Sequence, residues 1–233
     1  MMVQEAIEAY EWLARIDPAY HDARRKLAHL VEAPGAPTLA VKYREIIVAV
    51  VLGCRRDPAI DTHLRRALAA GATLRDMLEA FQAAVVLDGF PALHEECGDN
   101  ILGVKIAAPA ATASSKKSAT GPVSRGMREW AWLDQMDPAY DGARRDITAL
   151  VWTPAAPVLP VKIRELVACV VLAYRTFPTL DGHLRRAVRE GASVRELLEG
   201  MEAASLPGGF PILHYSLPFL NTIHDEIEAG TFV

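Results

Sequence analysis

The residues best suited to chemistry in this sequence are a glutamate and a histidine that occur together twice. Glu45 precedes His63, and Glu165 precedes His183 at the same spacing, 120 residues further along the chain. A carboxylate that binds one imidazole nitrogen sets the tautomer of the ring and leaves the other nitrogen available as a base. We therefore predict that these four residues are catalytic and that the reaction is an acid/base one.

The same residues are also consistent with a purely structural role. An unpaired charge is expensive to bury, so Glu45 would be held by a neighbouring arginine while His63 is simply a hydrogen-bonded helix residue. The spacing alone leaves both interpretations open.

Basic residues beside the histidines are the predicted substrate-binding groups. Two arginines follow each histidine, Arg65 and Arg66 in one place and Arg185 and Arg186 in the other. Adjacent helix residues point about 100° apart, so one arginine of each pair is expected to bind a substrate carboxylate. The alternative is a pair of ordinary surface arginines that contact nearby glutamates.

Two further histidines, His94 and His214, follow matching Gly-Phe-Pro turns. They are also predicted to bind substrate, and a surface position explains them equally well. A metal site built on His63 and His94 would need another ligand that the sequence does not supply. The prediction is therefore a site without a metal and without a cofactor.

The three cysteines have no redox or metal-binding spacing. Cys54 stands beside Arg55 and Arg56, which would favour its thiolate form, but it is interpreted as a cysteine at the end of a helix. Cys169 lies in an apolar run typical of the core, and Cys97 has no cysteine counterpart in the other half. An odd number of cysteines, after an N-terminal stretch without the apolar segment of a secretory signal, suggests reduced thiols and a cytoplasmic protein.

These residues belong to an internal duplication. The halves match without a gap, and about half of residues 12–94 are identical to the residues 120 positions later. Residues 107–126 are small and polar and are typical of a flexible linker. The sequence therefore predicts a first copy over 1–106 and a second copy over 127–233.

Proline, glycine and capping residues divide each copy into a predicted run of about six helices. In the first copy, these cover residues 3–15, residues 18–32, a segment from near Ala40, a segment from Pro58 to Gly71, a segment from Thr73 to Gly89 and a segment from Pro91. In the second copy, the corresponding run begins with a helix over 125–135. No stretch alternates with the period of a strand, so the predicted fold is all-α.

Composition narrows the range of partners. A net charge of −4 and a pI near 6.0 give no reason to expect nucleic acid. The longest apolar runs, 46–52 and 166–173, are too short to span a bilayer, so no membrane partner is predicted.

The order of these motifs resembles the carboxymuconolactone decarboxylase and alkylhydroperoxidase D-like superfamily. In the first copy, the resemblance is carried by residues 42–45 and the apolar run after them, then by 63–67, 71–80 and 89–91. The second copy repeats these motifs at 162–165, 183–187, 191–200 and 209–211. Together they cover about residues 39–94 and 159–214.

The resemblance implies an all-helical fold that assembles as trimers or hexamers. The peroxidase branch combines a Cys-x-x-Cys pair with a Glu–His proton relay, of which only the Glu–His pairs carry over. Arg56, Ala59, Thr176 and Thr179 stand where the cysteines would be. Thiol-dependent peroxide reduction is therefore disfavoured, because it needs an attacking and a resolving thiol.

The decarboxylase branch lacks the cysteines and removes CO2 from a lactone acid without a cofactor. The expected function is cofactor-independent acid/base chemistry on a small organic acid or lactone, in a homo-oligomer built as a trimer with six repeats. The alternatives are a peroxidase and a non-catalytic binding or assembly protein on the same scaffold.

Overall fold

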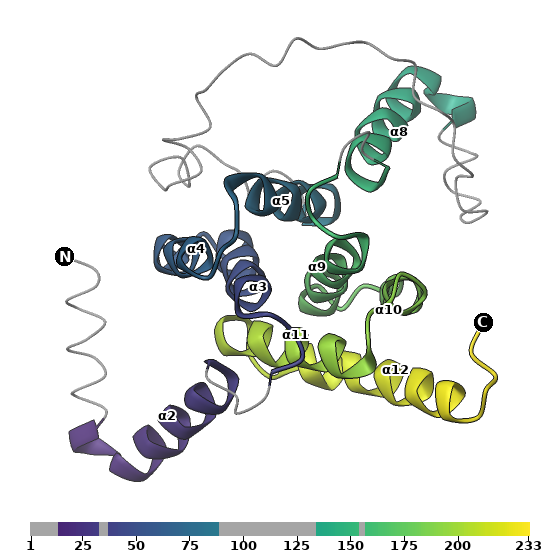
Figure 1. Ribbon diagram of the computed structural model, residues 1–233. Coiled ribbons are helices and arrows are strands. Elements are labelled where there is room, and N and C mark those ends of the chain that lie inside the picture. The colour runs from purple at the N-terminus through teal and green to yellow at the C-terminus, as the bar shows by residue number, and fades with distance from the viewer. Residues whose placement is uncertain (1–13, 33–36, 89–133, 154–156) are drawn as a thin grey trace.

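The structure, a computed structural model, describes residues 14–32, 37–88, 134–153 and 157–233. Within these ranges the chain contains helices and no strand, which confirms the predicted all-α fold. The helices, labelled in Figure 1, are α2 (Pro18–Glu32), α3 (Val41–Cys54), α4 (Ile60–Ala69), α5 (Leu74–Asp88), α8 (Pro138–Trp152), α9 (Val161–Tyr174), α10 (Leu180–Arg189), α11 (Val194–Gly208) and α12 (Pro211–Glu228). None of these helices is long and apolar enough to cross a membrane.

Several helices begin where the sequence predicted, because a side chain caps the first turn. Asp137 accepts a hydrogen bond from the backbone N–H of Tyr140 at 2.9 Å, ahead of a proline at the first position of α8. Ser193 and Glu196 form a reciprocal capping box at the start of α11. Most of the predicted helices over 3–15 and 125–135, and all of residues 89–126, lie outside the described residues, so the proposed copy boundaries stay predictions.

The fourth predicted helix of each copy begins later than expected. The sequence suggested starts at Pro58 and Pro178, whereas α4 begins at Ile60 and α10 at Leu180. The chain first makes a tight turn after α3 and α9, in which Arg56 and Thr176 adopt positive φ angles of 55° and 51°. The prolines lie in this turn and not in the helices.

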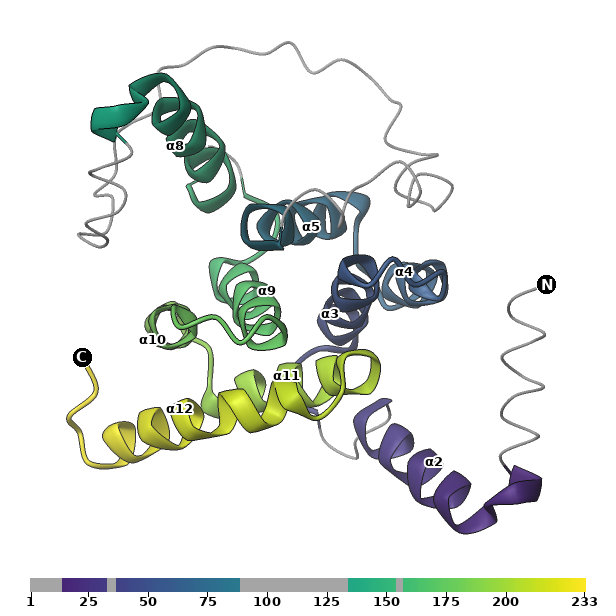
Figure 2. The ribbon, with the colours of Figure 1, turned by 180° about the vertical axis from the view of Figure 1, so that it is seen from behind.

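Helices from the two copies pack against each other at the centre of the molecule. Figures 1 and 2 show α3 and α9 side by side, with α5 on one side of this pair and α11 on the other. α5, from the first copy, packs on α9, and α11, from the second copy, packs on α3. α3 and α9 are buried along most of their length, and burying each aliphatic side chain contributes roughly 1.5–3 kcal/mol. Each copy therefore completes the core of the other.

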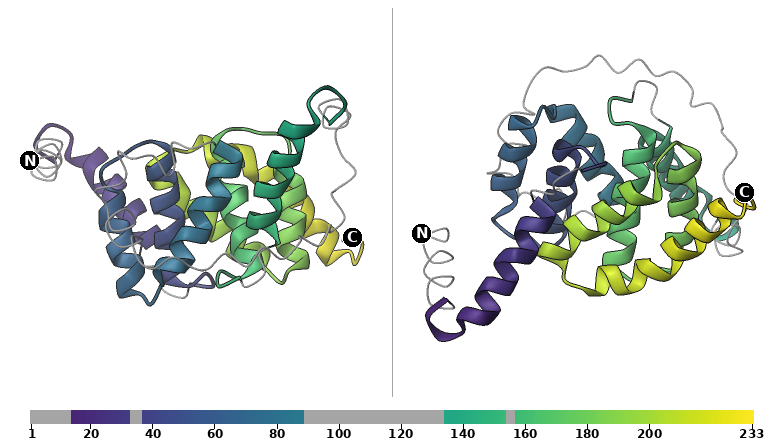
Figure 3. Two further views of the ribbon diagram at one scale, coloured as in Figure 1. Left: turned by 90° about the horizontal axis from the view of Figure 1, so that it is seen from above. Right: turned by 60° about the horizontal axis from the view of Figure 1, so that its bottom comes forward.

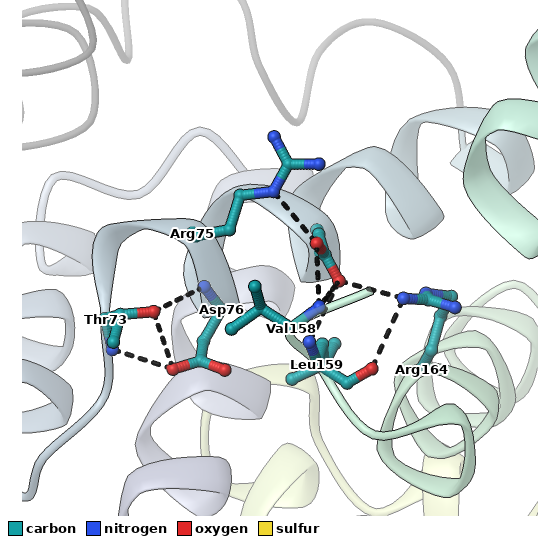
Figure 4. A network of polar contacts seen from close by, with 7 residues as sticks. Thr73, Arg75, Asp76, Val158, Leu159 and Arg164 are labelled. Atoms are coloured by element: carbon teal, nitrogen blue, oxygen red, sulfur yellow. Dashed lines mark hydrogen bonds and ion pairs between the residues drawn. The ribbon is translucent and has the colours of Figure 1, made fainter. Parts of the chain in front are cut away.

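A buried carboxylate joins the copies on each side of this core. Glu79 of α5 accepts hydrogen bonds from the backbone N–H groups of Val158 and Leu159, and its Oε2 lies 2.8 Å from Arg164 Nη2. Figure 4 shows the residues around this junction, including the Thr73–Asp76 pair that caps α5. On the opposite side, Glu199 of α11 accepts from the N–H groups preceding α3 in the same way.

Two helices project from this arrangement. α2 packs on α11 and α8 packs on α5, and Figures 1 and 3 show them extending from opposite ends of the molecule. Both projecting segments expose large apolar side chains at matching positions, which are Ile16, Tyr20, Leu27 and Leu30 in one and Met136, Tyr140, Ile147 and Leu150 in the other.

Candidate active site

The Glu–His pairs form because two helices pack against each other within each copy. α3 carries Glu45 and packs on α4, which carries His63; α9 carries Glu165 and packs on α10, which carries His183. In both copies, histidine Nδ1 lies 2.7 Å from glutamate Oε2. A carboxylate only accepts hydrogen bonds, so Nδ1 carries the proton and Nε2 is left with its lone pair.

The two members of each pair differ in how far their side chains are exposed to solvent. Glu165 is fully buried and the side chain of Glu45 is 13% exposed, whereas His63 and His183 keep 17% and 23% of their side chains exposed. Neither Nε2 atom is hydrogen-bonded to a described residue, and neither is among the buried atoms that lack a partner. In each ring, therefore, Nε2 faces solvent while Nδ1 is hydrogen-bonded to the glutamate.

The structure brings Arg186, a predicted substrate-binding residue, to the carboxylate of its pair. Arg186 Nε lies 3.0 Å from Glu165 Oε1, a charge contact without hydrogen-bond geometry, since Oε1 is buried and accepts no hydrogen bond. The side chain of Arg186 is 43% exposed, so a cation stands beside the pair and reaches solvent.

Two of the other predicted arginines are bound elsewhere. Arg185 contacts Asp181 and forms two bonds to Glu226 of α12, at 2.5 and 2.9 Å, and the bonds to Glu226 raise its pKa most. Arg65 is exposed and pairs with Asp61 one turn away. The fourth, Arg66, is an exposed residue of α4.

The structure does not bring the other predicted histidines, His94 and His214, to the Glu–His pairs in the part of the chain that it describes. His214 is exposed in the first turn of α12 and forms no hydrogen bond or ion pair with either Glu–His pair in the described part of the chain. His94 lies outside the described residues. A hollow of about 370 Å³ on α2 is lined by Asp22, Arg25, Lys26 and His29, and by neither pair.

One aromatic residue near the site was not anticipated. The ring of Trp152, at the end of α8, has its centroid 5.3 Å from that of His183, with the ring planes tilted by 46°. The sequence signal was a mismatch between the copies, because Glu32 stands at the equivalent position. That mismatch did not reveal contact, since α8 and α10 are separate elements.

Neither of the two described cysteines is activated: Cys54 ends α3, as its interpretation as a helix-end residue predicted, and the expectation that Arg55 and Arg56 favour its thiolate was wrong. Cys54 is 8% exposed, and burial, followed by the charge and hydrogen bond of Asp88, raises its pKa far above the ordinary value. Both arginines are exposed. Cys169, one turn after Glu165, is fully buried, and burial and the Glu165 charge raise its pKa as well.

These features define a class of protein: an all-helical tandem repeat with a buried carboxylate beneath a partly exposed imidazole in each repeat. A family model for the carboxymuconolactone decarboxylase family matches residues 18–95 and 139–222, and the chain belongs to this family. It is similar to a crystal structure from Burkholderia xenovorans LB400 of a protein provisionally assigned as a gamma-carboxymuconolactone decarboxylase subunit. The TM-score is 0.58 and the identity 25%, over 93% of this chain and 91% of the other. A search of curated proteins found no match.

Proposed function

We propose that the chain catalyses cofactor-independent acid/base chemistry on a small organic acid or lactone, and that decarboxylation is the reaction. The observation that carries this proposal is the 2.7 Å contact between Nδ1 and a buried or nearly buried carboxylate, in both copies, with Nε2 facing solvent. The names of the family and of the similar crystal structure support the choice of reaction.

In this mechanism the histidine accepts and donates the proton that decarboxylation requires. Loss of CO2 leaves the bonding electron pair on the substrate, where an adjacent unsaturated lactone carbonyl accepts it as an enolate. Nε2, which starts with its lone pair, first takes a proton from solvent, and the resulting imidazolium gives that proton to carbon and returns to the neutral ring. Glu45 or Glu165 stabilises the imidazolium form through Nδ1, and general acid/base catalysis of this kind is worth about 10²- to 10⁴-fold.

The substrate carboxylate needs a cation, and Arg186 is the described side chain best placed for this role in the second copy. It touches Glu165 Oε1 through Nε and remains 43% exposed. Arg185 is a poorer candidate because Asp181 and Glu226 already occupy its donors. Arg186 would therefore hold the carboxylate while His183 delivers the proton.

The peroxidase alternative is not favoured by any contact in the site. The raised pKa values of the Cys54 and Cys169 thiols oppose it, because the thiolate is the attacking species. A purely structural role for the pairs is the remaining alternative. It predicts that removing a histidine affects folding more than turnover.

The same proposal includes a homo-oligomer in the cytoplasm. The exposed apolar residues on both projecting segments support self-association. Light scattering after size-exclusion chromatography tests the assembly, for which a trimer is expected. A monomer at tens of micromolar would contradict it.

The decisive test of the reaction uses His63→Gln, His183→Gln and the double variant. CO2 release from a panel of unsaturated lactone acids is measured, and circular dichroism follows folding. We expect the double variant to lose about 10²- to 10⁴-fold in kcat while its unfolding midpoint changes little. Unchanged turnover, or loss of the fold along with turnover, would overturn the catalytic assignment.

A further inference from the structure

The second site has an aromatic surface for which the first copy has no equivalent residue. Trp152 lies 5.3 Å from His183 between ring centroids, whereas the residue 120 positions earlier is Glu32. In the described part of the chain, no aromatic ring is paired with His63. The two Glu–His pairs therefore have equal internal geometry and unequal neighbours.

We propose that Trp152 is a specificity-determining residue of the His183 site, which takes small carboxylates carrying a flat, unsaturated ring, whereas the His63 site shows no such preference. This inference rests on the proposed function for the location of the ligand, at Nε2 of His183. It goes further by naming the shape of the ligand and the residue that selects it.

The argument begins with the position of the indole. Aromatic groups prefer offset or tilted arrangements with centroids 4.5–7 Å apart, and Trp152 already adopts one with the imidazole. A ligand bound at the exposed edge of His183 lies within reach of the indole. A flat ring stacks on that surface, whereas a puckered ring of the same size makes fewer contacts.

The indole is also held in place before any ligand arrives. Trp152 is partly buried against the hydrophobic core, and its helix ends with a hydrogen bond from Thr153 N–H to the Ala149 carbonyl at 2.8 Å. α8 packs on α5, which belongs to the first copy. Because this surface is formed before binding, little conformational entropy is lost when a ligand binds.

A positive charge at the carboxylate of the same Glu–His pair completes the recognition. Arg186 stands at Glu165 Oε1 with its guanidinium partly exposed. A ligand that stacks on Trp152 and extends a carboxylate towards Arg186 satisfies both groups, and its reacting carbon then lies near Nε2. The chemistry that fits is one negative charge on a small planar ring.

The test compares benzoate with cyclohexanecarboxylate, which share the carboxylate and differ in flatness. Full-length protein with isotope-labelled histidine is titrated with each, and the ring signals of His63 and His183 are followed by NMR. We expect benzoate to bind at His183 about five- to ten-fold more tightly than cyclohexanecarboxylate. The His63 signal should show no preference.

Variants on α8 isolate the contribution of the indole. Trp152→Ala should abolish the preference and Trp152→Phe should retain part of it, while Leu150→Ala, at a 72% exposed position of the same helix, should leave it unchanged. The proposal is overturned if neither probe binds at His183, if both bind equally, if the preference survives Trp152→Ala, or if His63 shows it too. Selective binding of benzoate, together with no CO2 release from any lactone acid of the panel, would instead refute the proposed function and leave this inference standing.

Discussion

Glu45 and Glu165 occupy the same place in the two copies, yet the first keeps 13% of its side chain exposed and the second is fully buried. Around the second, Arg186 touches the carboxylate and Trp152 lies against the histidine ring. The hydrogen bond within each pair is nevertheless the same, 2.7 Å in both. The helix packing that the two copies share determines the geometry of the Glu–His pair. Residues that differ between the copies determine what surrounds it.

The largest difference expected between the copies concerns the buried carboxylates that join them. Glu79 and Glu199 each accept backbone N–H groups from the other copy, but only Glu79 also binds a buried arginine, Arg164, which is 1% exposed. Glu79→Ala leaves that charge uncompensated, so we expect a loss of about 3–5 kcal/mol in the free energy of unfolding. Glu199→Ala removes hydrogen bonds to neutral groups and one exposed arginine, and should cost about 1–3 kcal/mol.

Urea denaturation of the two full-length variants measures this contrast. Glu79→Gln serves as a control because it keeps the shape of the side chain. Equal losses in Glu79→Ala and Glu199→Ala would mean that Arg164 contributes nothing beyond the backbone contacts.

The contributions of the two sites to activity can be compared with the variants Glu165→Gln and Glu45→Gln. Glutamine retains an oxygen for Nδ1 and removes the charge that stabilises the imidazolium. We expect a loss of about 10²-fold in kcat for Glu165→Gln, and a smaller one for Glu45→Gln because its carboxylate is partly exposed. Steady-state rates on a substrate of the proposed class provide the measurement, and equal losses would indicate two equivalent sites.

Acid should weaken both junctions. Burial by itself raises the pKa values of Glu79 and Glu199, but hydrogen bonds from Leu159 and Leu39 N–H groups and from arginines outweigh it, so both values are lowered. A carboxyl group with a lowered folded pKa contributes stability above its ordinary value of 4.5, and this contribution is lost as the pH falls through the folded value. The free energy of unfolding should therefore fall below about pH 4.5.

The slope of that fall distinguishes the contributing groups. Stability measured by urea from pH 3 to 7 should decline less steeply in Glu79→Gln and Glu199→Gln than in the wild type. A slope that does not change in either variant would assign the acid sensitivity to other carboxylates.

The smallest effect is expected at a cross-copy contact that exists on one side only. Arg175 pairs with Asp88, whereas the position 120 residues after Asp88 is Gly208. Asp88→Asn removes a partly exposed pair and should cost about 1 kcal/mol or less. It should also lower the raised pKa of Cys54, because the Asp88 charge and hydrogen bond contribute to it after burial.

A faster reaction of Cys54 with a thiol reagent, measured under native conditions, would register that change. Burial is the largest cause of the raised pKa and remains in the variant, so the acceleration should be modest. A rate that falls would contradict the assigned influence of Asp88.

Local features of this fold were predictable because their causes lie within a few residues. Asp137 with Pro138 predicted the start of α8, and Ser193 with Glu196 that of α11. Contact between Glu45 and His63 was also anticipated, since consecutive helices joined by a short turn pack together. The start of α4 was missed because a left-handed residue, Arg56, precedes it without a glycine to signal it.

Contacts between distant elements were not predictable in the same way. A duplicated sequence does not reveal whether Glu79 binds within its own copy or, as found, reaches Leu159 in the other. The partner of Arg185 is Glu226, on a helix far along the chain, so this arginine was assigned to substrate. Trp152 reaches His183 through the packing of whole helices, which short-range patterns do not encode.

The reciprocal packing of the two copies gives this polypeptide the architecture of a dimer, with α5 on α9 matched by α11 on α3. In a dimer of identical subunits, every substitution occurs at both symmetry-related positions at once. Joining the halves in one polypeptide removes that constraint, so each substitution changes one side only. Trp152 opposite Glu32, and Glu226 opposite Ile106, are changes of this kind. A fused pair can thus keep one mode of packing and one Glu–His geometry while the surroundings of its two sites diverge.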